Sequence, residues 1–256
     1  MSIFLLGPPG SGKGTYGKLL SKSLSLPLLT ASTMLKSDSK FTEEYIKKGR
    51  LGPDDVVEST VRSYMYNEGW GSIKLTEKGW YTKNYILDGF PRTVGQYGLM
   101  KSWSPLINPP SICVHIDLPI KHCATKMKGR VECKYCNSVW NLSDVEDGVF
   151  RLPRIWPERL KCYCDKCTGM KVEEWKEEGE KYDYEWMLRR DDDSNPDIVA
   201  GRIQEYEEVT EKILEEVEEE RIVRFKPLEG LKSFGVLEEM VKERLEEIGE
   251  EDFFRI

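Results

Sequence analysis

The 256-residue chain lacks several features that mark whole classes of protein. No apolar run approaches the roughly 18 residues that a membrane helix needs. The apolar segment Ile3–Leu6 is too short for a secretory signal, and no basic leader precedes it. Positive charge is not in excess, because 38 Lys and Arg residues face 45 Asp and Glu residues. The net charge of −7 argues against a general nucleic-acid coat, so we expect a cytoplasmic protein with neither a membrane nor a nucleic acid as partner.

Histidine is scarce as well, and the only two, His115 and His122, are expected to be structural. The chain has seven cysteines, but without a secretory signal a scattered disulfide framework is not expected. Cys113 lies in a predicted strand and Cys123 in a predicted helix, each far from the other cysteines, so both are expected to be core residues.

The other five cysteines lie between positions 133 and 167 and include two CxxC pairs, Cys133/Cys136 and Cys164/Cys167. Each pair has the spacing of a zinc knuckle, and four thiolates make a closed tetrahedral site. Cys162 is an alternative ligand to Cys164, although its spacing to Cys167 is less favourable. We therefore predict a structural Zn²⁺ that stabilises a segment with too little core of its own.

Short apolar runs separated by amphipathic segments predict an α/β fold with a parallel sheet flanked by helices. The predicted strands are residues 3–6, 85–87, 111–118 and 221–225. Helices are predicted over 13–24 and from Pro119 to about Lys128. Two later helices are predicted from the apolar repeats Ile203, Tyr206, Val209, Ile213 and Val217, and Val236, Met240, Val241, Leu245 and Ile248. Residues 30–52, with no strand among them, and the longer stretch from 129 to about 184 fit the sheet poorly and are expected to be excursions from it.

A glycine-rich loop, Gly7-Pro-Pro-Gly-Ser-Gly-Lys-Gly-Thr15, lies between the first strand and the first helix. Glycines let successive backbone N–H groups curl around phosphate oxygens, and the helix N-terminus adds partial positive charge there. Lys13 can reach the β- and γ-phosphates, and the Thr15 hydroxyl can meet Mg²⁺. The strict P-loop pattern has Ser or Thr directly after the lysine, whereas here Gly14 intervenes.

Asp88 follows a buried strand, and Arg92 comes shortly after it. In open α/β sheets ligands bind beyond the carboxyl ends of the strands, so Asp88 is expected to face the phosphate loop and hold Mg²⁺ through water. Arg92 offers a planar guanidinium that suits phosphate.

Together, four segments resemble the adenylate kinase family of nucleoside monophosphate kinases. They are the loop GPPGSGKGT, the segment Leu87-Asp-Gly-Phe-Pro-Arg-Thr93 with Gln96, the segment Lys126-Met-Lys-Gly-Arg130, and Arg190-Asp-Asp-Asp193 with Arg202 beyond it. The resemblance implies a P-loop kinase core (residues 1–29, 53–128 and 194–256), a helical arm over AMP (30–52) and a zinc-binding lid over ATP (129–193). Many bacterial members of the family carry a zinc site in the lid.

The resemblance also implies residue roles, with ATP and AMP as substrates, Mg²⁺ as cofactor and a monomeric protein. The residues that cradle ATP would be Gly10, Ser11, Gly12, Lys13, Gly14, Thr15, Lys126 and Arg130. Those that bind AMP would be Ala31, Lys36, Arg50, Leu51, Gly52, Gly89, Phe90, Pro91, Arg92, Gln96, Arg190 and Arg202, with Gln96 reading the adenine edge. The residues that act on the transferring phosphoryl group would be Lys13, Asp88, Arg92, Arg130, Arg190 and Arg202.

Several positions depart from the family pattern. Lys36 replaces an arginine, Ala31 a threonine and Gly52 a common valine, while Lys126 takes the place of an arginine that stacks on the ATP base. Ala31 is also found in uridylate-cytidylate kinases, whereas Gln96 favours AMP. Arg189 and Arg190 both fit the register before the aspartates, and Arg190 needs the smaller insertion before Arg202. The extra sequence between residues 64 and 81 has no assigned role.

Three alternatives to an ATP:AMP kinase remain open at this point. A GTP-using or pyrimidine monophosphate kinase would keep the chemistry and change the nucleotide. A zinc-knuckle nucleic-acid-binding protein that uses ATP as a switch would explain the CxxC pairs and nearby tryptophans, although the acidic charge opposes it. An inactive scaffold is disfavoured because Lys13, Asp88, Arg92, Arg130 and Arg202 are all present.

Overall fold

The computed structural model describes most of the chain. The described residues are 2–36, 41, 44–45, 48, 50–68, 70, 74–76, 79–81, 83–103, 107, 109–133, 139–155, 187–189 and 191–249. No helix in these ranges has the length and apolarity needed to cross a membrane.

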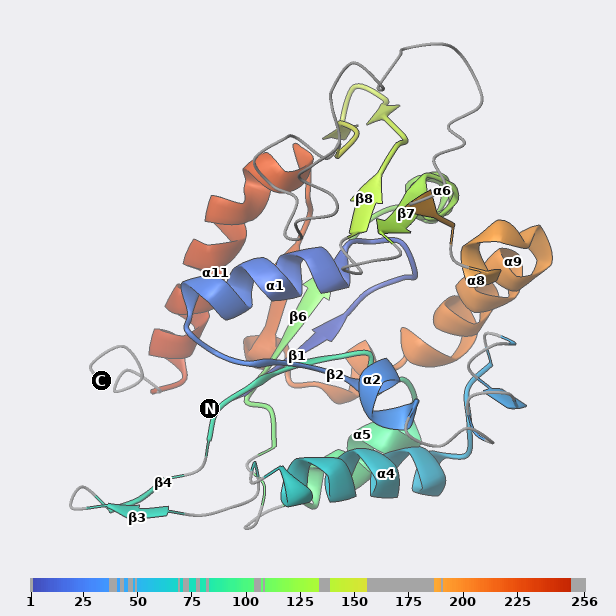
Figure 1. Ribbon diagram of the computed structural model, residues 1–256. Helices are drawn as coiled ribbons and strands as arrows, with labels where there is room; N and C mark the ends of the chain where they lie inside the picture. The colour runs from blue at the N-terminus through green and yellow to red at the C-terminus, as the bar shows by residue number, and fades with distance from the viewer. Residues whose placement is uncertain are drawn as a thin grey trace.

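A central parallel sheet of five strands organises the fold (Figure 1). The strand order is β12-β6-β1-β5-β2, and every neighbouring pair is parallel. The bounds are β1 Ile3–Leu6, β2 Leu28–Thr30, β5 Ile86–Asp88, β6 Ile112–Ile116 and β12 Ile222–Phe225. Four strands and the α/β class are confirmed. The prediction of no strand among residues 30–52 was wrong at its edge, because Thr30 ends β2, a three-residue edge strand too short to show a pattern.

Side chains of β1 alternate between the two faces of the sheet. Phe4 and Leu6 belong to a core with Leu87, whereas Ile3 and Leu5 belong to a second core on the other face. Both faces are therefore buried, which accounts for the continuous apolar runs of the central strands.

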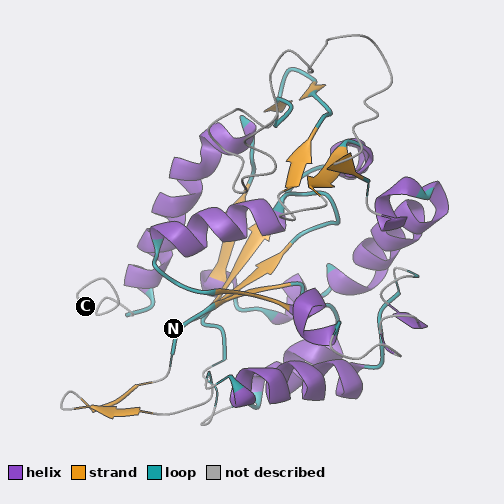
Figure 2. Ribbon diagram, viewed as in Figure 1, coloured by secondary structure: helices purple, strands orange, loops and turns teal. Residues whose placement is uncertain are grey.

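Helices cover both faces of the sheet (Figure 2). One core includes residues of α1 Lys13–Ser23 and α11 Phe234–Glu247. The other includes residues of α2 Ala31–Leu35, α4 Asp54–Asn67, α5 Val94–Lys101 and α10 Ile213–Glu216. The predicted apolar face of α11 is confirmed at Met240, Val241, Leu245 and Ile248, which pack in the core that contains α1, but not at Val236. Val236 is 57% exposed, and Leu237 is buried in its place.

Segments inserted between the main strands carry the remaining elements. A two-stranded sheet of β3 Lys74–Thr76 and β4 Gly79–Tyr81 lies in the extra sequence between residues 64 and 81. Beyond β6 come α6 Ile120–Lys128, β7 Arg130–Cys133, β8 Val139–Asn141, β9 Val145–Glu146, β10 Arg151–Leu152, β11 Met187–Leu188 and α8 Asp191–Ser194. β7 pairs with both β8 and β11, and β9 pairs with β10.

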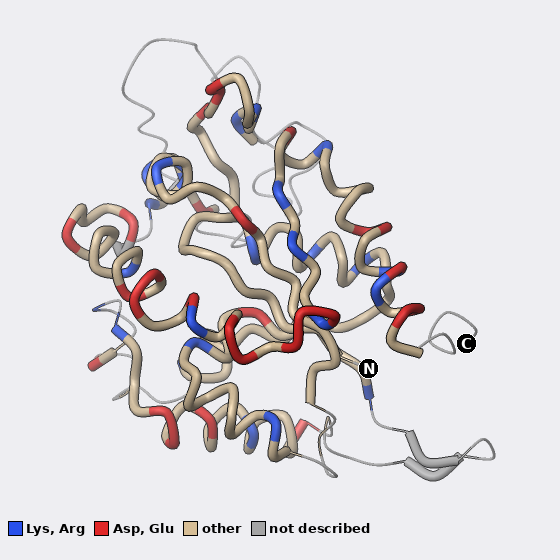
Figure 3. Tube along the Cα trace, turned by 180° about the vertical axis from the view of Figure 1, so that it is seen from behind, with Lys and Arg blue, Asp and Glu red and all other residues tan. Residues whose placement is uncertain are grey.

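The helix predicted through Val217 is broken into pieces. They are α9 Pro196–Glu205, the π-helix η3 Tyr206–Thr210 and α10. Tyr206, Thr210 and Ile213 are buried, whereas Val209, which was predicted on the same face, is only partly buried. The glutamates between residues 215 and 220 are exposed, whereas Val217 among them is buried, and the surrounding segment is strongly acidic (Figure 3). Short 3₁₀ helices, η4 Glu219–Arg221 and η5 Gly230–Ser233, flank β12.

Candidate active site

The glycine-rich loop joins β1 to α1, so the predicted strand, loop and helix are confirmed. Gly7, Gly10 and Gly12 have positive φ, a conformation that other residues rarely adopt. A side-chain carbon on Gly10 would lie 2.8 Å from Cγ of Met127, so helix α6 also requires glycine there. The loop thus holds its backbone in the curled form that suits phosphate oxygens, directly before the N-terminus of α1.

The ammonium of Lys13 lies inside this loop. Its Nζ donates hydrogen bonds to the carbonyl oxygens of Gly7, at 2.6 Å, and Pro8, at 3.0 Å. Burial lowers the pKa of Lys13 to about 8. The nearby Asp88 carboxylate has the opposite effect on this pKa, because it favours the charged form of the lysine. The guanidinium groups of Arg92 and Arg202 lower that pKa further, so three of the predicted site residues lie within electrostatic reach of Lys13.

Asp88 is the last residue of β5, and its neighbours on the adjacent strands are Leu5 and Thr30. A side-chain carbon on Gly14 would lie 3.4 Å from Oδ2 of Asp88, which places the carboxylate against the start of α1. The Thr15 hydroxyl belongs to the same turn. A carboxylate and a hydroxyl are hard oxygen donors of the kind that Mg²⁺ prefers, so these residues fit the expected cofactor.

The segment after Asp88 is held by a network around Gln96, which is only 1% exposed. Its Oε1 accepts the backbone N–H of Arg92, at 2.8 Å, and its Nε2 donates to Oδ1 of Asp54, at 3.1 Å. The hydroxyl of Thr93 also donates to Asp54 Oδ1, at 2.8 Å. The direction of the Gln96 amide is therefore fixed, and Asp54 was not singled out from the sequence.

A buried carboxylate joins two of the predicted phosphate-binding arginines. Asp193, with a side chain 2% exposed, accepts hydrogen bonds from Nε and Nη2 of Arg130, at 2.5 and 2.7 Å. Its Oδ1 also accepts from Nη1 of Arg202, at 3.1 Å. The first contact is bidentate, which fixes the plane of the Arg130 guanidinium. Sequence reasoning named the aspartate run but gave Asp193 no role, because nothing in the pattern shows which aspartate turns inward.

The residues around Arg202 also contact both segments expected to bind the acceptor. Oε1 of Glu205 accepts the backbone N–H of Leu51, at 3.0 Å, and the Thr210 hydroxyl donates to the carbonyl oxygen of Arg92, at 2.8 Å. Burial raises the pKa of Glu205, while the Leu51 N–H and nearby arginines oppose that rise.

Gly52, where a valine is common in the family, packs against an aromatic ring. A side-chain carbon at this position would lie 2.5 Å from Cε2 of Phe41, which is itself 7% exposed. Phe41 thus fills the space that a valine side chain at position 52 would take.

The other predicted acceptor residues differ in their exposure. Ala31 is buried, and a side-chain carbon on Gly89 would lie 3.7 Å from its Cβ. Lys36 and Arg50 are exposed. Arg190 lies outside the described residues, whereas Arg189 is described and exposed.

Cys133 is buried at the end of β7. Cys136, Cys162, Cys164 and Cys167 lie outside the described residues. Within the described part of the chain, no three His, Cys, Asp or Glu residues are grouped as metal ligands. Cys113 and Cys123 are buried, as expected for core residues.

Comparison with known proteins gives a consistent result. The adenylate kinase family model matches residues 5–222. The chain is 27% identical to an adenylate kinase of Syntrophomonas wolfei over 97% of this chain and 100% of that protein. It is 28% identical to an adenylate kinase of Rickettsia prowazekii over 84% of this chain and 85% of the relative. A Geotalea uraniireducens adenylate kinase is also 28% identical, over 88% of this chain and 89% of its own length.

Proposed function

Because the chain belongs to the adenylate kinase family, a family of phosphotransferases, we propose that it transfers the terminal phosphoryl group of ATP to AMP. The observation that carries the proposal is that the glycine-rich loop lies against Asp88 at the carboxyl end of β5, with Arg92 and Arg202 within electrostatic reach of Lys13. Three cations around one loop suit a reaction whose charge is spread over phosphoryl oxygens. The products of the forward reaction are two molecules of ADP.

The donor nucleotide is assigned to the loop before α1. Backbone N–H groups of residues 10–15 would bind the β- and γ-phosphates, and Lys13 would exchange its carbonyl partners for a phosphate oxygen. Mg²⁺, which adenylate kinases use with ATP, would neutralise phosphate charge, with Asp88 and Thr15 supplying oxygen ligands. Arg130 and Arg202, held together by Asp193, would orient the transferring group from the opposite side.

The acceptor is assigned to residues of the arm and of the segment after β5. Arg92 would hold the AMP phosphate, and Gln96 would read the base. The hydrogen bonds that fix the Gln96 side chain support adenine as the base of the acceptor. Its Oε1 faces the Arg92 N–H and its Nε2 faces a carboxylate, so the amide cannot reverse without two unfavourable contacts. An amide presents an acceptor beside a donor, which matches the N6 and N1 edge of adenine and also the N4 and N3 edge of cytosine.

The three-part division into core, arm and lid belongs to the same proposal. Residues 30–52 would close over AMP, residues 129–193 over ATP, and the remaining residues would form the core. The hydrogen bond between Leu51 and Glu205 supports a closing arm, because it joins the end of the arm to the helix that carries Arg202. Closure would exclude water from the transferring phosphoryl group.

The nearest rival is a kinase for another nucleotide, which Ala31 keeps open because uridylate-cytidylate kinases also have alanine at this position. A coupled assay across ATP, GTP, CTP and UTP with AMP, CMP, UMP and GMP tests the proposal. We expect the highest kcat/KM for ATP with AMP. A preference for UMP, CMP or GMP would contradict AMP as the acceptor, and a lack of transfer with every pair would remove the proposed function itself.

We also propose that the four thiolates of Cys133, Cys136, Cys164 and Cys167 hold a structural Zn²⁺. The spacing of the two pairs supports this proposal, and Cys133 is a buried thiol at a strand end. Elemental analysis of the purified native protein should find about one zinc per chain, and Cys133→Ser should lower both the zinc content and the Tm. A folded native protein that contains no zinc would contradict the proposal; Cys113→Ser is the control, because Cys113 lies in the central sheet.

A further inference from the structure

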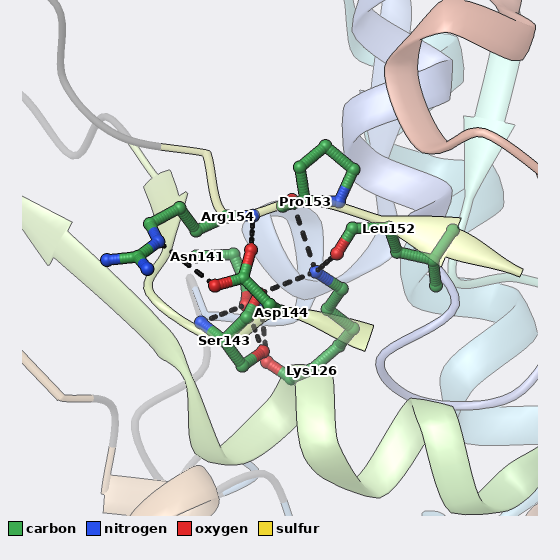
Figure 4. A network of polar contacts seen from close by, with 7 residues as sticks. All are labelled: Lys126, Asn141, Ser143, Asp144, Leu152, Pro153 and Arg154. Carbon is green, nitrogen blue, oxygen red and sulfur yellow. Dashed lines mark hydrogen bonds and ion pairs between the residues drawn. The ribbon is translucent and has the colours of Figure 1, made fainter. Parts of the chain in front are cut away.

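Lys126, which stands where the family has a base-stacking arginine, has its ammonium enclosed by carbonyl oxygens (Figure 4). Its Nζ donates to the carbonyl oxygens of Ser143 and Leu152, both at 2.8 Å, and more distantly to that of Pro153, at 3.4 Å. An ammonium has three N–H groups, so these three acceptors use all of its hydrogen-bonding capacity.

The other end of Lys126 is fixed by the same segment. Its backbone carbonyl accepts a hydrogen bond from Nδ2 of Asn141, at 2.7 Å, while Oδ1 of Asn141 accepts from the Ser143 hydroxyl, at 2.6 Å. A side-chain carbon on Gly129 would lie 2.6 Å from Cβ of Ser143, so the glycine lets this loop approach α6. Asp144 and Arg154 hold the two ends of this loop together, because the Asp144 carboxylate accepts hydrogen bonds from the backbone N–H and the Nε of Arg154.

The segment that Lys126 contacts, residues 141–154, is also joined to the core on two sides. Val145, Phe150 and Leu152 form a small apolar cluster with Cys123 of α6 and Leu118. The backbone N–H of Arg151 donates to the carbonyl oxygen of Leu228, at 2.6 Å, which lies in the loop after β12.

Arg130 lies next to the segment of residues 141–154. It opens β7, and its partner across the β7–β8 ladder is Asn141, the residue that caps Lys126. The backbone of Gly129 is also tied to the segment, because its carbonyl oxygen accepts the N–H of Leu142, at 2.7 Å. Arg130, two residues beyond the end of α6, therefore lies beside the segment whose carbonyl oxygens Lys126 contacts, and its guanidinium reaches Asp193.

We propose that Lys126 is a positioning residue rather than a ligand of the ATP base: it holds residues 141–154 against α6 and so fixes Arg130 over the transferring phosphoryl group. This inference rests on the proposed function only for its catalytic consequence. The loss of the stacking arginine also removes one contact that would distinguish ATP from other nucleoside triphosphates.

Lys126→Met tests the proposal, since methionine keeps an unbranched side chain of similar length without the three donors. The matched control is Lys128→Met, because Lys128 is exposed on the same helix. Hydrogen exchange of the nucleotide-free proteins should be faster over residues 141–155 in Lys126→Met and unchanged in Lys128→Met. This measurement needs no activity, so it tests the contacts even if the proposed function fails.

The catalytic consequence is tested by kinetics. We expect Lys126→Met to lower kcat by a factor of about 10 to 100, because a small displacement of an orienting group costs that much. The ratio of kcat/KM for ATP to that for GTP should not change. In the Arg130→Ala background, Lys126→Met should cause little further loss, since the two residues act in series.

Lys126→Arg separates the two roles of this position. If Lys126 positions the loop, arginine keeps donors for the carbonyl oxygens and preserves both most of kcat and the ATP:GTP ratio. If Lys126 instead contacts the base, arginine should raise the preference for ATP and Lys126→Met should lower it. A changed base preference without faster exchange over residues 141–155 would overturn the proposal.

Discussion

Replacing Lys13 by alanine should lower kcat by a factor on the order of a thousand, the scale of losing one donor that stabilises transition-state charge. Lys13 is the charged residue of the loop, and its two hydrogen-bond partners are carbonyl oxygens of that same loop. A phosphate oxygen is a stronger partner for an ammonium than a neutral carbonyl, so substrate should draw the side chain out of these contacts. The KM for AMP should change far less, because AMP is assigned to Arg92 and Gln96.

Steady-state kinetics with both substrates varied measures this effect. Lys18→Ala is the matched control, since Lys18 is exposed on the same helix. Circular dichroism should show that Lys13→Ala remains folded. An unchanged kcat in a folded Lys13→Ala protein would refute the role of this residue at the transferring phosphate.

The pKa of Lys13 also predicts how the activity should depend on pH. Burial lowers this pKa to about 8 in the nucleotide-free protein, so the side chain loses its charge as the pH rises above 8. Because kcat/KM reports the free enzyme, its value for ATP should fall above about pH 8, whereas kcat should fall only at higher pH. Bound phosphate favours the ammonium and raises its pKa, which explains the difference.

The main architecture could be predicted from sequence because it depends on local patterns. The apolar run of β1, the glycines after it and the repeat of α1 are contiguous, so strand, loop and helix follow from about 20 residues. β2 was missed because its three residues are only partly buried at the sheet edge, where neither alternation nor a continuous apolar run develops.

The contacts of the site were harder to predict because they join distant residues. The approach of Asp193 to Arg130 spans 63 positions, and the contact of Glu205 with Leu51 spans 154. A motif gives the residue types that meet, but it does not show which carboxylate of Asp191, Asp192 and Asp193 turns inward. At Lys126 the position in the motif predicts a role that the contacts do not show. The position predicts stacking on the base, whereas the ammonium is enclosed by carbonyl oxygens.

Asp193→Asn should have the second large effect, on both stability and activity. The carboxylate is buried between two guanidinium groups, and its replacement removes the negative charge that both of them contact. Loss of one partner from a buried ion pair costs about 3 kcal/mol or more of the free energy of unfolding. Urea denaturation should show this loss, and Asp197→Asn, an exposed aspartate in α9, should change stability by at most ~1 kcal/mol.

The kinetic effect of Asp193→Asn should differ in kind from that of Lys13→Ala. Arg130 and Arg202 remain present and have lost a competing carboxylate, so ATP should bind as tightly as before or more tightly. Their guanidinium groups are no longer held in one plane, so kcat should fall on the order of a hundredfold. ATP should also raise the Tm of Asp193→Asn more than that of the native protein, because phosphate replaces the missing negative charge. If ATP binding weakens in parallel with kcat, Asp193 acts by holding the fold of the site together rather than by orienting the two arginines.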